Sequence, residues 1–346
     1  MIAVTPEANG AWFHYAMTFA ARALHLGSLR VVLAAACAGI LLAAGCAGCS
    51  GSGRHTTSHF GATAAPTATG PASGLARVGG RRSYALPDPR RRMQRFTVRD
   101  TASGLSNRVL VYLPAGYRPS TSRRYAVVLG LTGFPMKPEA FTKVNFLATA
   151  DRLASGHRMG SSIFVIPQVN NPETLDTECV NGPAGDPQTD TWLSEEVPRW
   201  VVRHFHVRVG RDSWAVMGYS FGGWCAASLA MRHPGVFGAA LVFSGYFELD
   251  FGRSYHPLTE ARRRGYDLIR LARTAAPPVA MWVFASRRDS HAWPTTHRFL
   301  RAVRSPTTVT AVIGSTGGHH NGVYEPYTGS ALTWLATTLR GFRVQR

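Results

Sequence analysis

Acidic residues are scarce in this 346-residue chain, in which 19 aspartates and glutamates stand against 38 lysines and arginines. The formal net charge is +19 at pH 7, and nearly all of the positive charge is arginine. The sequence also has no internal repeat, no GxxxxGK[ST] loop and no cluster of metal-ligand residues. These absences argue against a solenoid, a P-loop nucleotide-binding protein and a protein with a bound metal or other cofactor.

The positive charge has no nucleic-acid-binding motif with it, so we expect no nucleic-acid partner. Arginines cluster at 81–82 and 90–92, in the amino-terminal third of the chain. Such clusters suit anionic lipid headgroups or anionic envelope polymers. The alternative is a GC-rich genome that places arginine on a solvated surface.

The amino-terminal stretch predicts export. Arg30 precedes the apolar run 31–44, and small residues follow it, which is typical of a signal peptide. Cys46 follows Ala43-Ala44-Gly45 and is a possible lipidation site of a lipoprotein. The competing prediction is an uncleaved membrane anchor. The region before the apolar run is unusually long for a signal peptide, which makes Met17 an alternative start to Met1.

Three segments follow from this composition. Residues 1–49 are predicted to be a signal peptide or membrane anchor. Residues 50–84, rich in Ser, Gly, Thr, Ala and Pro, are predicted to be a disordered linker with a basic end. Residues 85–346 are predicted to form one catalytic domain. The protein is then exported, and is either anchored to the cell membrane or secreted.

Cysteine is rare in the predicted domain. Three of the five cysteines lie in the amino-terminal stretch, which leaves Cys179 and Cys225. Two cysteines in an oxidising compartment often pair, so a disulfide is expected. The alternative is a free Cys225 that packs as a small apolar side chain.

Short apolar runs alternate with stretches of helix-forming residues from residue 108 onward. We expect strands at 108–113, 125–131, 162–167, 214–217, 239–244, 279–285 and 307–313. We expect helices at 141–153, 191–205, 221–233 and 330–340, with a possible kink at Pro198. This order predicts an α/β fold with a mostly parallel central sheet and helices on both faces.

The motif Gly-Tyr-Ser-Phe-Gly at 218–222 lies between an expected strand and an expected helix. A nucleophile elbow needs this order, and it needs residues without side chains two positions before and after the nucleophile. Gly218 and Gly222 occupy those positions around Ser220. The alternative is a glycine-rich turn with an idle serine.

A nucleophilic serine needs a base, and the base needs an acid that orients it. Asp289 follows the strand at 279–285, and His319 follows the strand at 307–313, in the order Ser, acid, His that this fold uses. Asp250 is the rival acid, and His320 is the rival base.

The oxyanion hole requires two backbone N–H groups. Phe221, directly after the serine, is one expected donor. Phe134, in the loop after the strand at 125–131, is the other, because Pro135 has no N–H.

These motifs together resemble the esterase branch of the α/β hydrolases, which includes esterase D-like enzymes and exported actinobacterial mycolyltransferases. The resemblance spans most of 105–340 and rests on the run at 108–117, the elbow at 218–223, and Gly317-Gly318-His319 followed by a helix with Trp334. It implies that Ser220 is the nucleophile and His319 the base.

The sequence therefore predicts an exported serine esterase that cleaves carboxylic esters of small molecules, lipids or glycans through an acyl-serine intermediate. One alternative is an acyltransferase, like the mycolyltransferases, that moves an acyl group to a sugar or lipid hydroxyl. A second alternative is an inactive wall-binding domain. Residues 246–278 are expected to cover the site.

Overall fold

The computed structural model describes residues 56–60, 88–99, 102–119, 122–251 and 255–345. The chain divides into two units, Met1–Gly51 and Ser52–Arg346. The first unit lies outside the described residues, and so do the expected signal peptide or anchor and Cys46. Of the described residues, none belongs to a helix with the length and apolar character that crossing a bilayer requires.

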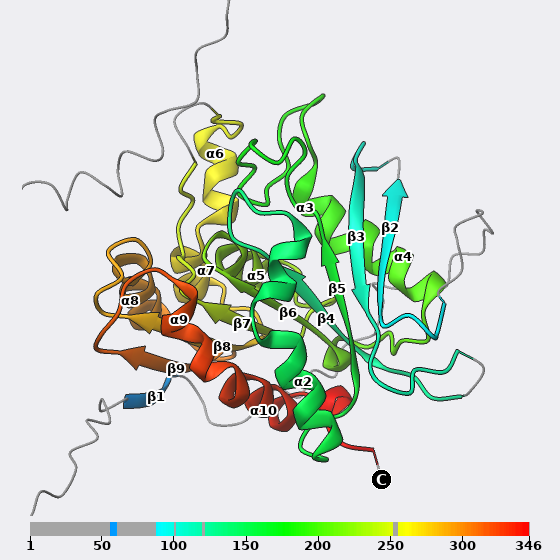
Figure 1. Cartoon of the computed structure of the whole chain (residues 1–346). Helices are drawn as coiled ribbons and strands as arrows, with labels where there is room; N and C mark the ends of the chain where they lie inside the picture. Colours follow the sequence, from blue (N-terminus) through cyan, green and yellow to red (C-terminus); the bar gives the residue numbers. More distant parts are fainter. Residues whose placement is uncertain (1–55, 61–87, 100–101, 120–121, 252–254, 346) are drawn as a thin grey trace, which may run out of the picture. The chain divides into compact units, whose positions relative to one another are not determined.

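In the described part of the chain, nine strands form one sheet in the order β1-β9-β8-β7-β6-β4-β5-β3-β2 (Figure 1). The six strands from β5 to β9 across the centre are parallel to one another, and β1, β3 and β2 pair antiparallel at the two edges. The strands are β1 (Thr56–Phe60), β2 (Met93–Arg99), β3 (Ser106–Tyr112), β4 (Ala126–Leu131), β5 (Ser162–Pro167), β6 (Trp214–Tyr219), β7 (Ala239–Phe243), β8 (Ala280–Ser286) and β9 (Thr308–Gly314). The predicted mostly parallel α/β sheet is confirmed.

Side chains alternate between two apolar cores, one on each face of the sheet. In β4, Val127 and Leu129 belong to one core and Val128 to the other, because successive strand residues point to opposite faces. Helices α4, α5, α7 and α8 close the first core, and α2, α9 and α10 close the second. Figure 1 shows α2 and α10 side by side on the near face. Both faces are therefore covered, which explains the nearly continuous apolar runs of the central strands.

The helices are α2 (Phe146–Ser155), α3 (Thr189–Thr191), α4 (Val197–His204), α5 (Phe221–Arg232), α6 (Glu260–Arg263), α7 (Leu268–Thr274), α8 (Trp293–Ala302), α9 (Asn321–Tyr324) and α10 (Thr328–Thr338). Short 3₁₀ turns occur at η1 (Pro138–Lys143), η3 (Arg211–Ser213), η4 (Arg264–Tyr266), η5 (Glu325–Tyr327) and η6 (Arg340–Phe342), and η2 (Trp192–Glu196) is a π-helical segment.

The helix expected at 141–153 is divided: it is a 3₁₀ turn, η1, followed by α2, with a break at Val144 and Asn145. The helix expected at 191–205 is present, because α3, the π-helical η2 and α4 follow one another without a gap and keep helical backbone angles at their junctions. Pro198 lies directly after the π-helical segment, inside this continuous run, and it has no N–H for a helical hydrogen bond. The irregularity of the helix is therefore next to the proline, as a π-helical segment.

Sequence patterning missed both edge strands. In β2 only Val98 is buried, so the strand lacks the apolar run that marks the central strands. The strand β1 lies inside the expected disordered linker at 50–84, so that prediction is wrong for Thr56–Phe60. The remaining linker residues lie outside the described part of the chain.

Candidate active site

Ser220 stands at the sharp turn between β6 and α5. Its backbone has φ +57° and ψ −126°, a left-handed conformation that a residue with a side chain rarely adopts. A Cβ on Gly218 would overlap the backbone of Gly222, and a Cβ on Gly222 would overlap the carbonyl oxygens of Leu131 and Thr132. The two glycines are therefore required by close approach, and the turn has the geometry of a nucleophile elbow.

Three of the expected side chains meet above the carboxyl edge of the sheet. The Oγ of Ser220 lies 2.7 Å from Nε2 of His319, and Nδ1 of the same ring lies 2.7 Å from Oδ2 of Asp289. Asp289 follows β8 and His319 follows β9, neighbouring parallel strands whose carboxyl ends lie at one edge. The loops after these strands therefore bring the three residues into one hydrogen-bonded row.

The Asp289 side chain is fully buried but well supplied with hydrogen bonds. Its Oδ1 accepts the backbone N–H groups of His291 (3.1 Å) and Ala292 (3.0 Å). Burial acts to raise the pKa of this carboxyl, but the bond from the His319 ring and these N–H groups hold the pKa below its usual value. Asp289 is therefore ionised at neutral pH, and can orient a histidine ring.

Neither rival residue takes part in this row. The Asp250 side chain is 60% exposed, and its carboxylate lies 3.6 Å from Nδ1 of His291. His320 is exposed, and it precedes the short helix α9. The geometry thus selects Asp289 over Asp250 and His319 over His320 as the partners of Ser220.

The two expected oxyanion donors flank the elbow. Phe221 is the first residue of α5, so its N–H has no carbonyl one turn earlier in the helix. Phe134 belongs to the loop after β4, and its ring lies 5.8 Å from that of Phe221. A Cβ on the preceding Gly133 would lie 3.5 Å from the Cβ of Ser220, so this loop runs directly beside the serine.

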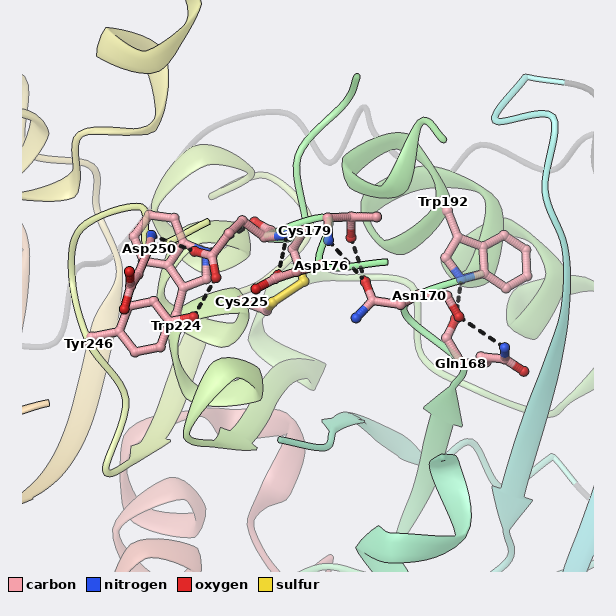
Figure 2. Close-up of a disulfide and its surroundings, with 11 residues drawn as sticks. Gln168, Asn170, Asp176, Cys179, Trp192, Trp224, Cys225, Tyr246 and Asp250 are labelled. Atoms are coloured by element: carbon pink, nitrogen blue, oxygen red, sulfur yellow. Dashed lines mark hydrogen bonds between the residues drawn. A yellow bond between two sulfur atoms is a disulfide. The ribbon is translucent and has the colours of Figure 1, made fainter. Parts of the chain in front are cut away.

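Cys179 and Cys225 are joined by a disulfide (Figure 2). Cys225 lies on α5, and Cys179 lies in the long loop between β5 and α3. The bond therefore fixes this loop to the helix that begins at the serine.

Sequence reasoning missed Glu178, whose side chain is fully buried next to the disulfide. Its carboxyl accepts hydrogen bonds from the Tyr246 hydroxyl and from the backbone N–H of Asp250 at 3.2 Å. Its backbone carbonyl accepts the indole N–H of Trp224 at 3.0 Å. Burial, and secondarily the charge of Asp176, raises the pKa of Glu178 well above its usual value.

Ring contacts connect Tyr246 to the candidate base. Tyr246 stacks on Trp224 and contacts the His291 ring, with 4.9 Å between centroids (Figure 2 shows Tyr246 beside Trp224). The His291 ring meets that of His319 edge-on at 5.2 Å. Burial, and then the charge of His319, lowers the pKa of His291. His291 is thus a neutral neighbour of the row, and no local pattern in the sequence indicates it.

The segment 246–278, which is expected to cover the site, is rich in aromatic residues. Tyr246, Phe247 and Tyr266 are buried in the core of the domain, and only Phe251 and Tyr255 are partly exposed. Most of these rings therefore pack inside the protein.

The described residues include no group of three or more His, Cys, Asp or Glu side chains arranged to hold a metal ion. The row of Ser220, His319 and Asp289 on a mostly parallel sheet is the arrangement of an α/β-hydrolase-fold serine hydrolase or acyltransferase.

Comparison with known proteins gives the family. A family model described as "Putative esterase" matches residues 102–334, which is more than half of the chain. The chain belongs to this esterase family, as its motifs indicated.

Solved structures of esterases share the fold. A ferulic acid esterase matches with a TM-score of 0.60 and 18% identity, over 72% of this chain and 98% of that chain. An S-formylglutathione hydrolase from Agrobacterium tumefaciens matches with a TM-score of 0.59 and 17% identity, over 71% and 95% of the two chains. An uncharacterised Corynebacterium glutamicum protein is 30% identical over 158 residues, which are 45% of this chain but only 37% of that relative.

Proposed function

We propose that the protein is an exported carboxylic ester hydrolase that works through an acyl-Ser220 intermediate. The observation that carries the mechanism is the continuous row from Ser220 Oγ through the His319 ring to the buried Asp289 carboxylate. Family membership supports the reaction class.

In the acylation step, His319 Nε2 accepts the proton of the Ser220 hydroxyl while the oxygen attacks the ester carbonyl. Asp289 accepts the Nδ1 hydrogen bond and stabilises the imidazolium that forms. The N–H of Phe221 and an N–H of the loop at Phe134 face the developing oxyanion. His319 then donates its proton to the leaving alcohol, and the acyl-enzyme remains.

In the deacylation step, water takes the place of the alcohol. His319 removes a proton from the water, and the resulting hydroxide attacks the acyl carbon. The second tetrahedral intermediate collapses, the proton returns to Ser220, and the free acid leaves. All atoms of the reaction come from ester and water, so no cofactor is needed.

Transfer to a hydroxyl acceptor uses the same acyl-enzyme and is the second candidate from the sequence. It requires a groove that holds the acceptor next to His319. The burial of Tyr246, Phe247 and Tyr266 leaves few aromatic faces in the 246–278 segment for a sugar or an acyl chain. The burial of these rings favours hydrolysis over transfer. The complete row of Ser220, His319 and Asp289 argues against an inactive wall-binding domain.

A fluorophosphonate probe tests the nucleophile. We expect one covalent adduct on Ser220 in the full-length protein, and we expect Ser220→Ala to abolish it. The same variant should lower ester turnover at least about 1,000-fold with the fold retained. Ser155→Ala, which changes an exposed serine at the end of α2, is the control. Near-normal turnover of folded Ser220→Ala protein would refute the proposal.

Export is proposed from the sequence of residues 1–49. We expect the full-length chain in the membrane or extracellular fraction of its cell, and we expect Cys46→Ala to move it out of the membrane fraction if Cys46 is lipidated. Retention of both proteins in the cytoplasm would contradict export. Retention of the variant in the membrane would favour the uncleaved anchor.

A further inference from the structure

Two adjoining hollows lie at the amino ends of the parallel strands. One has a volume of about 600 Å³ and the other about 490 Å³. They share Arg123, Arg124, Arg208 and Gln345, so they lie next to each other. We name the two together the amino-edge pocket, because its segments immediately precede β4 and β5.

The charge of this pocket has one sign. Arg118 lines the first hollow, Arg343 and His157 line the second, and the shared arginines line both. No aspartate or glutamate is among the described residues that line either hollow. Five arginines therefore line a space large enough for a small anionic ligand.

Two of these arginines are held in place by the protein. Arg123 donates to Ser161 Oγ at 3.3 Å and lies over the ring of Tyr125, 5.1 Å from its centroid. Arg208 is half-buried and donates to the carbonyl oxygen of Gly341 at 2.5 Å. Their side chains are therefore largely ordered before any ligand arrives, which reduces the entropy lost on binding.

The arginines also repel one another. Burial lowers the pKa of Arg208, Asp212 partly offsets this effect, and the charge of Arg123 lowers the pKa further. Asp212 itself lies 3.6 Å from Arg340, so its charge is shared. An anion placed between the guanidinium groups would relieve this repulsion and would receive charge-assisted hydrogen bonds.

We propose that the amino-edge pocket binds a phosphate-bearing anion that carries at least two negative charges. Planar guanidinium forks match the oxygens of phosphate groups, and several forks along one pocket select a multiply charged ligand over a single carboxylate. The pocket lies at the strand ends opposite to those that carry Ser220, Asp289 and His319. The proposal is therefore independent of the esterase mechanism.

Calorimetric titration of the full-length protein with tripolyphosphate tests the proposal. We expect saturable binding at about 100 mM salt that weakens as the salt concentration rises. The double variant Arg123→Gln/Arg124→Gln removes two exposed charges from the pocket and should weaken binding at least about tenfold. Ester turnover should be unchanged, because both residues lie far from Ser220.

Arg270→Gln/Arg273→Gln on α7 is the matched control, since it removes two exposed charges at a different place. This control should bind tripolyphosphate within about twofold of the wild type. Equal weakening in the two double variants would show a diffuse effect of net charge and would overturn the site. Absence of binding to tripolyphosphate and to anionic vesicles would overturn it as well.

Vesicles distinguish the source of the phosphate. Full-length protein is tested for binding to vesicles that contain cardiolipin, whose headgroup carries two phosphates, with phosphatidylcholine vesicles as the comparison without net charge. Loss of vesicle binding in Arg123→Gln/Arg124→Gln but not in the α7 control would identify phospholipid headgroups as ligands. Binding to tripolyphosphate alone, with the same variant dependence, would identify a soluble phosphate chain.

Discussion

At the scale of single residues, two adjacent histidines show how position decides chemistry. His319 lies 2.7 Å from both Ser220 and Asp289, whereas His320 points to solvent from the next position in the chain. Gly317 has φ +80°, and this backbone conformation turns the loop back over the sheet. Because both residues are histidines with the same intrinsic chemistry, the path of the loop decides which imidazole can accept the serine proton.

His319→Ala should lower kcat/KM for a short-chain ester at least about 1,000-fold, because the Ser220 proton then has no acceptor. His320→Ala is the matched control and should stay within about threefold of the wild type. Steady-state turnover at several pH values measures both variants. A larger loss in the 320 variant would transfer the role of base to His320.

At the scale of elements, the disulfide connects the loop after β5 to helix α5. We expect Cys179→Ser/Cys225→Ser to lower the free energy of unfolding by about 2–5 kcal/mol, since the bond closes a long loop in the unfolded chain. Urea unfolding of the wild type with and without reductant provides the comparison, and the reduced wild type should approach the variant.

Peptide mapping after alkylation of the unfolded, unreduced protein tests the bond directly. Neither cysteine should be modified under these conditions. Modification of both would show that Cys179 and Cys225 carry free thiols, and the stability difference would then need another cause.

The same loop carries Glu178, and its raised pKa gives stability a pH dependence. The folded protein holds the Glu178 proton more tightly than the unfolded chain. Its contribution to stability is therefore complete below the unfolded pKa of about 4.3, and it is lost as pH rises through the folded pKa. The glutamine of Glu178→Gln does not titrate. The free energy of unfolding of the wild type, relative to that of the variant, should therefore fall as pH rises.

Unfolding free energies of both proteins from about pH 4 to pH 8 check this, because carboxyls present in both proteins cancel in the difference. Glu260→Gln, at the exposed start of α6, is the control for loss of one carboxyl. A constant difference between wild type and Glu178→Gln over this range would contradict a buried neutral Glu178.

Much of this arrangement follows from local sequence. The elbow requires glycine at 218 because a Cβ there would overlap Gly222 inside the same five residues, and it requires glycine at 222 because a Cβ there would overlap the backbone after β4. Both glycines belong to one short motif, so the sequence indicates the elbow. Asp289 and His319 follow apolar strands, and parallel strands end at a common edge. These rules predicted the fold and family, which are confirmed, and selected residues that the structure brings together. Their catalytic roles remain predictions.

Other features depend on partners that are distant in the sequence. Glu178 is buried by Tyr246 and Trp224, which lie far along the chain, and nothing near residue 178 signals a buried carboxyl. The edge strand β2 has one buried side chain and therefore lacks the apolar pattern of the central strands. Similarly, the amino-edge pocket assembles arginines from three separate segments.

At the scale of the whole molecule, the burial of aromatic residues in the segment after β7 bears on the balance between water and alcohol as acceptor. With a short-chain ester and millimolar trehalose, glycerol or a wall glycan, we expect free acid as the main product. Chromatography of acid and acylated acceptor measures this partition. Acylated acceptor as the dominant product would make the protein a transferase.

The carboxyl ends and the amino ends of the parallel strands lie on opposite sides of the sheet, and the length of a central strand separates them by about 20 Å. Ser220 lies beyond the carboxyl ends of the strands, and the arginines of the amino-edge pocket lie at their amino ends. A ligand fixed to a surface and held by the arginines would therefore orient the molecule, with its catalytic opening directed away from the support. An enzyme held in this way would reach esters on the side away from the bound surface, and would not reach esters in that surface.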